Sequence, residues 1–317
     1  MVSPRLPTAF VGLTDADWLE HLRTLSDLDE VNFWQPSPHG FSALVPGEPF
    51  IFKLHAKQGG LAAGVAFFVK YIELPVSIAW EYFGPANGAS SLAEMRDRVE
   101  RYRRVRPDPL EDYRIGCVML SNPVFFDPAD RFPVPGWHPS IQVGRRYPLV
   151  DEPGLGLWAR VQGLISARAK GDRILAVHEA PAQRYGTPIF LRPRLGQATF
   201  KAVVLEAYDR RCSVTGEKVL PTLEAAHIRP FAEGGEHRID NGLLLRRDLH
   251  ALFDRGYLTV TPDLEVRVSR RLRTDFNNGE EYMALSGRPL RSPVEPTHAP
   301  NPEFLEWHNQ KKFKSVA

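Results

Sequence analysis

The 317-residue sequence is long for one domain and comfortable for two, and its 43% hydrophobic residues supply enough apolar material for two cores. Its 40 Lys and Arg residues nearly balance 38 Asp and Glu residues, so the formal charge of +2 excludes a polycation. Any contact with nucleic acid must therefore come from local basic patches. The two cysteines, Cys117 and Cys212, exclude a disulfide framework and a four-cysteine zinc ribbon, and they favour a reducing compartment.

The first half of the chain predicts an α+β domain. Strand-like runs recur between Pro, Gly and Asn residues, at Pro49–Leu54, Ala62–Tyr71, Arg114–Leu120 and Val124–Phe126. Helices are predicted over Asp15–Ser26, from about Ser91 to Val105, and over Gly156–Ala169. Ser90 or Ser91 is the expected N-cap of the second helix, because Glu94 stands close to the capping-box position.

A connector is expected between the two halves. The segment Val177–Gly196 contains three prolines and several arginines, and it sustains no period of 2 or 3.6. We therefore divide the chain into a domain at 1–175, a linker at 176–196 and a second domain at 197–317. In the second domain we predict helices over Phe200–Tyr208 and Arg246–Asp254, and strands over Tyr257–Thr261 and Leu264–Val268. The Pro-rich tail ends in Phe304, Leu305 and Trp307, which suggests that it packs back on this domain.

Four polar residues in the last third are spaced in a way that suits phosphodiester hydrolysis. His227 precedes Asn241 by 14 positions, Asn241 precedes His250 by 9, and His250 and Asp254 form an i, i+4 pair on one helical face. A neutral His can take a proton from an attacking water, because its pKa lies near the operating pH. An imidazole and a carboxylate on one helical face can bind the divalent cation that neutralises the charge growing on the phosphoryl oxygens.

These residues resemble the HNH, or ββα-metal, nuclease family, in which a two-stranded hairpin and a helix hold a metal ion between them. The resemblance implies that His227 is the general base and that Asn241 fixes this base through a hydrogen bond. It also implies that His250 is a metal ligand and that Asp254 supplies another ligand or a phosphate contact. The resemblance covers roughly Arg192 to Leu272 and is carried further by Arg192–Gln197, Phe200, Tyr208, Arg211-Cys212, Thr215-Gly216 and Gly256. Such a lead-in resembles that of HNH domains fused to DNA-recognition modules.

The sequence departs from the family pattern at two positions. Ala226 stands where many members carry an Asp or His ligand, and Glu224, on the same strand face, could replace that ligand. Waters and the substrate phosphate could fill the remaining positions around a hard cation such as Mg²⁺ or Mn²⁺. Thr215 stands where zinc-stabilised relatives carry a second Cys, so we expect no structural zinc.

Basic residues flank the predicted site. We expect Arg229 to clamp the scissile phosphate and expect some of Lys201, Arg210, Arg211, Arg246 and Arg247 to contact the DNA backbone. His237, in the loop between His227 and Asn241, is interpreted as a solvated residue.

The first domain carries aromatic clusters instead of a comparable motif. The segment Phe41–Tyr71, with Pro46-Gly47-Glu48 followed by a hydrophobic strand and Ala63-Gly64, resembles a small β-barrel of the pseudouridine-synthase-and-archaeosine-transglycosylase (PUA) type. This resemblance implies a PUA-like β-barrel with flanking helices, and its relatives include domains that read modified bases by flipping them. Trp34, Tyr82 and Trp137 could stack on such a base, and Gln35 or Asn87 could bind its edge. The alternative for each aromatic residue is that it fills the core.

Together these features predict a modification-dependent restriction endonuclease that cuts double-stranded DNA carrying a modified cytosine. One active site per chain is consistent with a homodimer, because a double-strand break needs two cuts. Two alternatives remain open: a DNA-binding regulatory protein with an inactive HNH fold, suggested by Ala226, and an RNA-directed nuclease, suggested by PUA-type barrels in RNA enzymes. The first ten residues lack a signal pattern and no apolar run approaches about 20 residues, so we expect a cytoplasmic protein without a membrane span.

Overall fold

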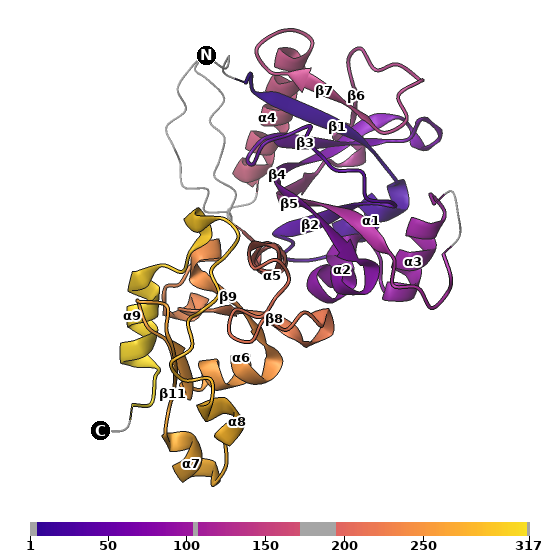
Figure 1. Ribbon diagram of the computed structural model, residues 1–317. Coiled ribbons are helices and arrows are strands. Elements are labelled where there is room, and N and C mark those ends of the chain that lie inside the picture. The colour runs from indigo at the N-terminus through magenta and orange to yellow at the C-terminus, as the bar shows by residue number, and fades with distance from the viewer. Residues whose placement is uncertain (1–4, 104–106, 172–194, 316–317) are drawn as a thin grey trace. The chain divides into compact units, whose positions relative to one another are not determined.

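The computed structural model describes residues 5–103, 107–171 and 195–315 and forms two compact units, Met1–Arg194 and Leu195–Ala317 (Figure 1). Apart from Leu195 and Gly196, the predicted linker at 176–196 lies outside the described residues. Within the described residues, no helix combines the length and the apolar character needed to cross a membrane.

The first unit is built on a mixed sheet of seven strands. They are β1 (Thr8–Thr14), β2 (Glu30–Gln35), β3 (Pro49–Leu54), β4 (Leu61–Pro75), β5 (Arg114–Phe125), β6 (Phe132–Pro133) and β7 (Gly144–Pro148). Their order is β2-β5-β4-β3-β1-β7, with β6 paired to β4. Strands β1 and β3 are parallel, and the other pairs are antiparallel.

The expected β-barrel is not supported by this sheet. Among the described residues, the end strands β2 and β7 do not pair with each other, so the sheet stays open. Hydrophobic alternation predicted where the strands lie, but it carries no information on which strands pair across a crossover. The strand predicted at Val124–Phe126 is the end of β5, which runs unbroken from Arg114 and absorbs two register shifts against β4.

Both faces of the sheet are covered. Every residue of β3 is buried: Phe50 and Phe52 belong to one core, with Trp18 of α1 (Ala16–Arg23), whereas Ile51 belongs to the other, with Val161 of α4 (Gly154–Gly171). Successive side chains of a strand point to opposite faces, so a strand between two layers is mainly apolar, and the buried Lys53 is the exception in β3.

The remaining helices of this unit are α2 (Val76–Phe83) and α3 (Leu92–Glu100), with short 3-10 turns at η1 (Ala56–Gln58), η2 (Gly84–Asn87) and η3 (Pro128–Asp130). The predicted N-cap of α3 is confirmed at Ser91, whose hydroxyl accepts a hydrogen bond from the Glu94 amide at 3.2 Å. The Glu94 carboxylate in turn accepts from the Ser90 amide at 2.8 Å. The first bond satisfies a helix N–H group that has no partner inside the helix, and the second fixes the residue before the N-cap.

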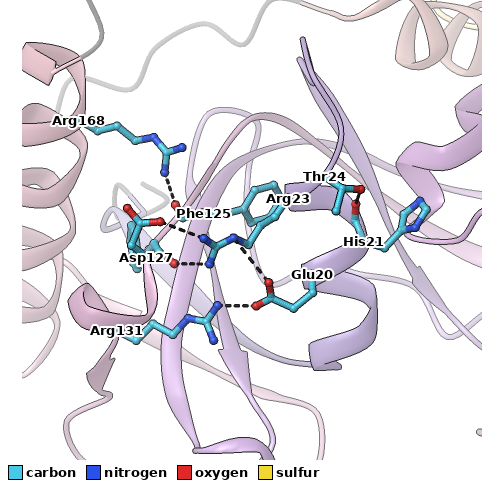
Figure 2. Close-up of polar contacts among 9 residues, drawn as sticks. Glu20, His21, Arg23, Thr24, Phe125, Asp127, Arg131 and Arg168 are labelled. Carbon is cyan, nitrogen blue, oxygen red and sulfur yellow. Dashed lines mark hydrogen bonds and ion pairs between the residues drawn. The ribbon is translucent and has the colours of Figure 1, made fainter.

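A set of charged contacts fixes α1 beside the end of β5 (Figure 2). Arg23 of α1 lies 2.9 Å from the carboxylate of Asp127 and donates to the carbonyl of Phe126 at 3.0 Å. Arg131 reaches back to Glu20 of α1 at 2.6 Å, and Arg168 of α4 donates to the carbonyl of Phe125. Exposed ion pairs stabilise little, so these contacts mainly orient α1 relative to the segment that follows β5.

The second unit begins with α5 (Gln197–Ala207), followed by the antiparallel strands β8 (Leu223–His227) and β9 (Gly242–Arg246) and the helix α6 (Arg247–Asp254). The two-stranded ladder and following helix agree with the hairpin–helix order expected for this segment. Gly242 is required here, because a Cβ at this position would lie 2.5 Å from Val204 of α5. The rest of the unit comprises β10 (Leu258–Val260), β11 (Val266–Val268), α7 (Arg271–Phe276), α8 (Glu280–Met283) and α9 (Pro302–Lys311), with 3-10 turns η4 (Leu220–Thr222), η5 (Phe231–Glu233), η6 (Ile239–Asn241) and η7 (Pro296–His298).

The tail packs back on the unit, as predicted. Leu305 of α9 is fully buried, and His308 is inserted between α6 and β10. The His308 ring lies flat on Phe253 of α6, with centroids 3.8 Å apart, and its nitrogens contact the Thr259 hydroxyl at 2.7 Å and the Phe253 carbonyl at 3.1 Å. Helix α9 therefore supports α6 from its buried side.

Candidate active site

The strands and the helix bring the predicted residues to one end of the β8–β9 ladder. His227 is the last residue of β8 and pairs with Gly242, the first residue of β9. Helix α6 starts directly after β9 and buries Leu249 and Phe253. His250 and Asp254 lie on the accessible side of α6, with 22% and 56% of their side chains exposed.

His227 is held in a mostly buried position. Phe200 of α5 lies flat against its imidazole, with centroids 3.9 Å apart and planes 11° apart. Its Nε2 atom lies 2.9 Å from Nδ1 of His237. Burial, together with smaller contributions from charge on His237 and on His250, lowers the pKa of His227 to about 4. The imidazole is therefore neutral at neutral pH and can accept a proton.

Asn241 is fully buried and binds main chain. Its carbonyl oxygen accepts from the Arg229 amide at 2.9 Å, and its amide donates to the carbonyls of Arg229 and Glu236, each at 2.9 Å. The expected hydrogen bond from Asn241 to the general base is thus replaced by contacts with the loop on either side of it, and the imidazole contact is made by His237 instead.

Glu224, His250 and Asp254 are brought together around one imidazole. Nδ1 of His250 lies 2.8 Å from the Glu224 carboxylate, and Nε2 lies 3.4 Å from the Asp254 carboxylate. Arg247 lies 3.1 Å from the second oxygen of Glu224. Ala226 is completely buried, so its position offers no ligand.

These donors fit a hard divalent ion only in part. The two carboxylates approach opposite nitrogens of His250, and the described residues contain no group of three or more His, Cys, Asp or Glu side chains that could hold a metal ion. A donor pair of one imidazole and one carboxylate, both accessible, suits an ion that keeps waters or phosphate oxygens in its remaining positions. Three protein ligands on one ion, the expectation from sequence, do not meet here.

A family model matches the segment that carries these residues. Residues 212–261 match the HNH endonuclease family. The matched segment contains His227, Asn241, His250 and Asp254, and it supports a nuclease activity. No curated protein matched the sequence. One similar solved structure, the "Modification dependent TagI restriction endonuclease", is 18% identical with a TM-score of 0.28; the alignment covers 84% of this chain, which spans only 62% of that one.

The basic residues predicted to contact phosphate differ in how far other protein groups already occupy them. Arg210 is paired with Glu206 at 2.7 Å and Arg246 with Asp248 at 3.0 Å, so a phosphate would have to compete with these carboxylates. Arg229, two residues after His227 in the chain, donates to the Glu233 carbonyl at 2.6 Å and lies over the Trp307 ring. These two contacts fix the orientation of its guanidinium. Lys201 is half-buried on α5.

The predicted base-binding residues do not form one pocket. Trp34 and Gln35 line a cavity of about 270 Å³ in the first unit. Trp137 belongs to the core on the opposite face of the sheet, under Lys53 at 4.7 Å, and Tyr82 lies on α2 outside the cavity lining. Asn87 is fully buried, and its amide binds the carbonyls of Ala79 and Gly84, so it serves the fold. Aromatic spacing along a chain does not tell which face of a sheet a ring will occupy.

Several residues of both sites were missed by sequence reasoning. His237 was interpreted as solvated, but it contacts His227. In the cavity, Asp15 accepts a hydrogen bond from the Tyr102 hydroxyl at 2.6 Å and lies 3.5 Å from His55. Nothing in the sequence marked this group beyond a predicted helix that starts at Asp15. The complete lining is Leu13, Thr14, Asp15, Trp18, Phe33, Trp34, Gln35, Pro36, His55, Tyr102, Gln142 and Val143.

Proposed function

We propose that this protein is a modification-dependent DNA endonuclease, in which the first unit accepts a flipped modified base and the HNH segment hydrolyses a phosphodiester bond nearby. The main support for nuclease activity is the HNH match over 212–261, together with a neutral His227 and the His250–Asp254 pair inside the matched segment. His227 would take the proton of the attacking water. His250 and Asp254 would hold a divalent ion, which stabilises the charge on the phosphoryl oxygens when bound.

Glu224 has a supporting task in this proposal. If Nδ1–H of His250 donates to Glu224, the lone pair of Nε2 faces Asp254 and is available to an ion. A carboxylate that binds the far nitrogen of a metal-ligating His fixes its tautomer and orientation. Arg247, paired with Glu224, would hold that carboxylate in place.

The cavity of the first unit supports the targeting step. Its walls include the rings of Trp18, Phe33 and Trp34, and its polar groups include Asp15 and Gln35. Flat apolar walls with a few hydrogen-bonding groups suit a planar heteroaromatic base taken out of the stack. The indole N–H of Trp34 donates to the Asn87 carbonyl at 3.0 Å, so this ring is already fixed in orientation. A modified cytosine is the base we expect.

The nuclease is tested with matched plasmids and with Mg²⁺ or Mn²⁺. Plasmids carry cytosine, 5-methylcytosine, 5-hydroxymethylcytosine or glucosylated 5-hydroxymethylcytosine, and cleavage is followed on gels for the full chain and for His227→Ala. We expect preferential cutting of one modified plasmid and none by His227→Ala. Equal cutting of all plasmids removes the modification step. DNA binding without cleavage by the parent chain supports the regulatory alternative, and preference for RNA of the same sequence supports the RNA-directed one.

The base cavity has a matched control in the same sheet. Trp34→Ala should abolish the preference between modified and unmodified plasmids, because stacking on an aromatic ring contributes about 1–3 kcal/mol per base. Trp137→Ala removes the same side chain on the other face of the sheet and should keep the preference. Loss of preference in both variants, or in neither, contradicts a base pocket at Trp34. Thermal unfolding of both variants checks that each is folded.

A further inference from the structure

The loop between β8 and β9 brings the imidazole of His237 into contact with that of His227. Nε2 of His227 and Nδ1 of His237 are 2.9 Å apart, and the two ring centroids are 5.0 Å apart with planes inclined by 55°. Each ring is backed by a phenylalanine: Phe200 stacks on His227, and Phe231 stacks on His237 with planes 13° apart. The contact is therefore supported on both sides by flat apolar surfaces.

The loop that carries His237 is fixed by main-chain contacts. Asn241 donates from one amide nitrogen to the carbonyls of Arg229, two residues after His227, and of Glu236, one residue before His237. The Gly235 amide donates to the Pro230 carbonyl at 3.0 Å, and a Cβ on Gly235 would lie 1.9 Å from the Arg229 carbonyl oxygen. The buried Asn241 thus sets the distance between the strand bearing one histidine and the loop bearing the other.

We propose that His237 is a positioning residue for the general base: its Nδ1 atom accepts a hydrogen bond from Nε2–H of His227 and thereby holds His227 in the tautomer whose Nδ1 lone pair can take a proton from water. This inference rests on the proposed function, because it assigns a task within the same reaction. It gives His237 a role that the HNH match and the sequence motif leave unassigned.

The chemistry follows from the two tautomers of a neutral imidazole. A hydrogen bond between two neutral rings needs one N–H and one lone pair. If His227 donates through Nε2, its Nδ1 atom has a free lone pair and can act as a base. If His237 donates instead, His227 carries its proton on Nδ1, and that atom cannot accept a proton from water. When a water transfers its proton to Nδ1, its oxygen bonds to phosphorus and the P–O bond to the leaving strand breaks. The leaving oxygen departs as an alkoxide and takes a proton from solvent, while the imidazolium keeps its Nε2–H bond to His237 and later returns its extra proton to solvent. Orientation of a catalytic His by a neighbour follows the same physical logic as in other acid–base sites.

Two nearly isosteric substitutions separate this role from packing. In His237→Asn, the side-chain oxygen on Cγ takes the place of Nδ1 as an acceptor, whereas His237→Leu keeps the branched shape and removes the acceptor. With a 5-methylcytosine plasmid and Mn²⁺, we expect His237→Leu to lower kcat roughly 10- to 100-fold, the usual effect of losing such an orienting partner, with KM within about threefold. His237→Asn should recover most of kcat. Equal losses in both variants, or full activity of His237→Leu, overturn the proposal.

The tautomer itself is measured by long-range ¹H–¹⁵N NMR on the full chain labelled at its histidines. We expect a protonated Nε2 and an unprotonated Nδ1 at His227 in the parent protein and in His237→Asn, with mixed tautomers in His237→Leu. A proton on Nδ1 of His227 in the parent protein overturns the proposal. This readout needs no cleavage, so an inactive parent chain with the expected tautomer would reject the proposed function while the histidine contact stood.

Discussion

Phe200 and His227 lie face to face, 3.9 Å apart, although 27 positions separate them in the chain. The contact couples α5, which precedes the matched HNH segment, to the residue that we propose as the general base. A fully buried phenyl ring thus excludes water from one whole face of the imidazole. Orientation of His227 depends on a residue outside the motif that identifies it.

Replacing the Phe200 ring should lower kcat by more than the accompanying loss of stability would explain. Phe200→Leu should lower the free energy of unfolding by about 1–2 kcal/mol through lost packing and should lower kcat by more than tenfold, because His227 gains rotational freedom. Urea unfolding and plasmid cleavage measure the two effects. The Phe253–His308 pair has the same stacked geometry, 3.8 Å and 11°, away from His227. Phe253→Leu should therefore cost similar stability and leave kcat within about threefold; parallel losses of kcat would contradict the argument.

Gly235→Ala should disable the site through the backbone. The added Cβ would meet the Arg229 carbonyl oxygen at 1.9 Å and the Asn241 amide at 2.9 Å, so the loop must move away from His227. We expect loss of cleavage and a lower melting temperature. Gly163 in α4 is the control, since nothing lies within 4 Å of its Cβ position and alanine favours a helix by about 0.5–1 kcal/mol. If Gly235→Ala cuts normally, the loop has no fixed role.

Ion binding should depend on Asp254 more than on Glu224. Isothermal titration with Mn²⁺ on the full chain should show the largest loss for His250→Ala and Asp254→Asn, and a loss of about tenfold for Glu224→Gln, which only orients the imidazole. Asp248→Asn is the control on the same helix, because Asp248 is paired with Arg246 at 3.0 Å. A larger effect of Glu224→Gln than of Asp254→Asn would place the ion at Nδ1 of His250 instead.

The second unit should lose stability in mild acid. Burial lowers the pKa of His308 to about 4, as it does that of His227, whereas an unfolded His titrates near 6.5. Between these values the unfolded chain binds protons that the folded chain does not, so stability falls as the pH drops from about 6.5 towards 4. Protonation of the buried His308 costs on the order of 2 kcal/mol at pH 5, and that of the more exposed His227 costs less. Urea unfolding in EDTA at pH 7.5 and pH 5 measures this, and His308→Gln should remove about half of the difference. An equal acid loss in His308→Gln would contradict the assignment.

The second unit was predictable to the extent that its chemistry is local in sequence. The i, i+4 pair of His250 and Asp254 and the returning tail followed from spacing and apolar pattern, and the hairpin followed from the resemblance to HNH nucleases. The partner of His227 did not, because the path of a loop rich in Gly is set by buried main-chain contacts such as those of Asn241. The sequence around a single His in such a loop does not indicate which residue its side chain will contact.

The first unit was predicted less well for a related reason. Strand positions such as Pro49–Leu54 were confirmed, but the open strand order was not foreseen, because pairing depends on contacts distant in sequence. For the same reason Trp34 and Trp137 were grouped together, although they belong to cores on opposite faces of the sheet. The polar group of the cavity, Asp15 with Tyr102, joins residues 87 positions apart.

Helix α9 has a consequence for how the chain is made. The contacts of His308 with Thr259 and Phe253 span 49 and 55 positions, and the Lys314 amide donates to the Gly256 carbonyl at 2.9 Å. Helix α6 packs on β8, β9 and β10, and it lacks the part of its support that α9 supplies until residues up to about Lys314 have left the ribosome. We expect the second unit to reach its final packing only after this point.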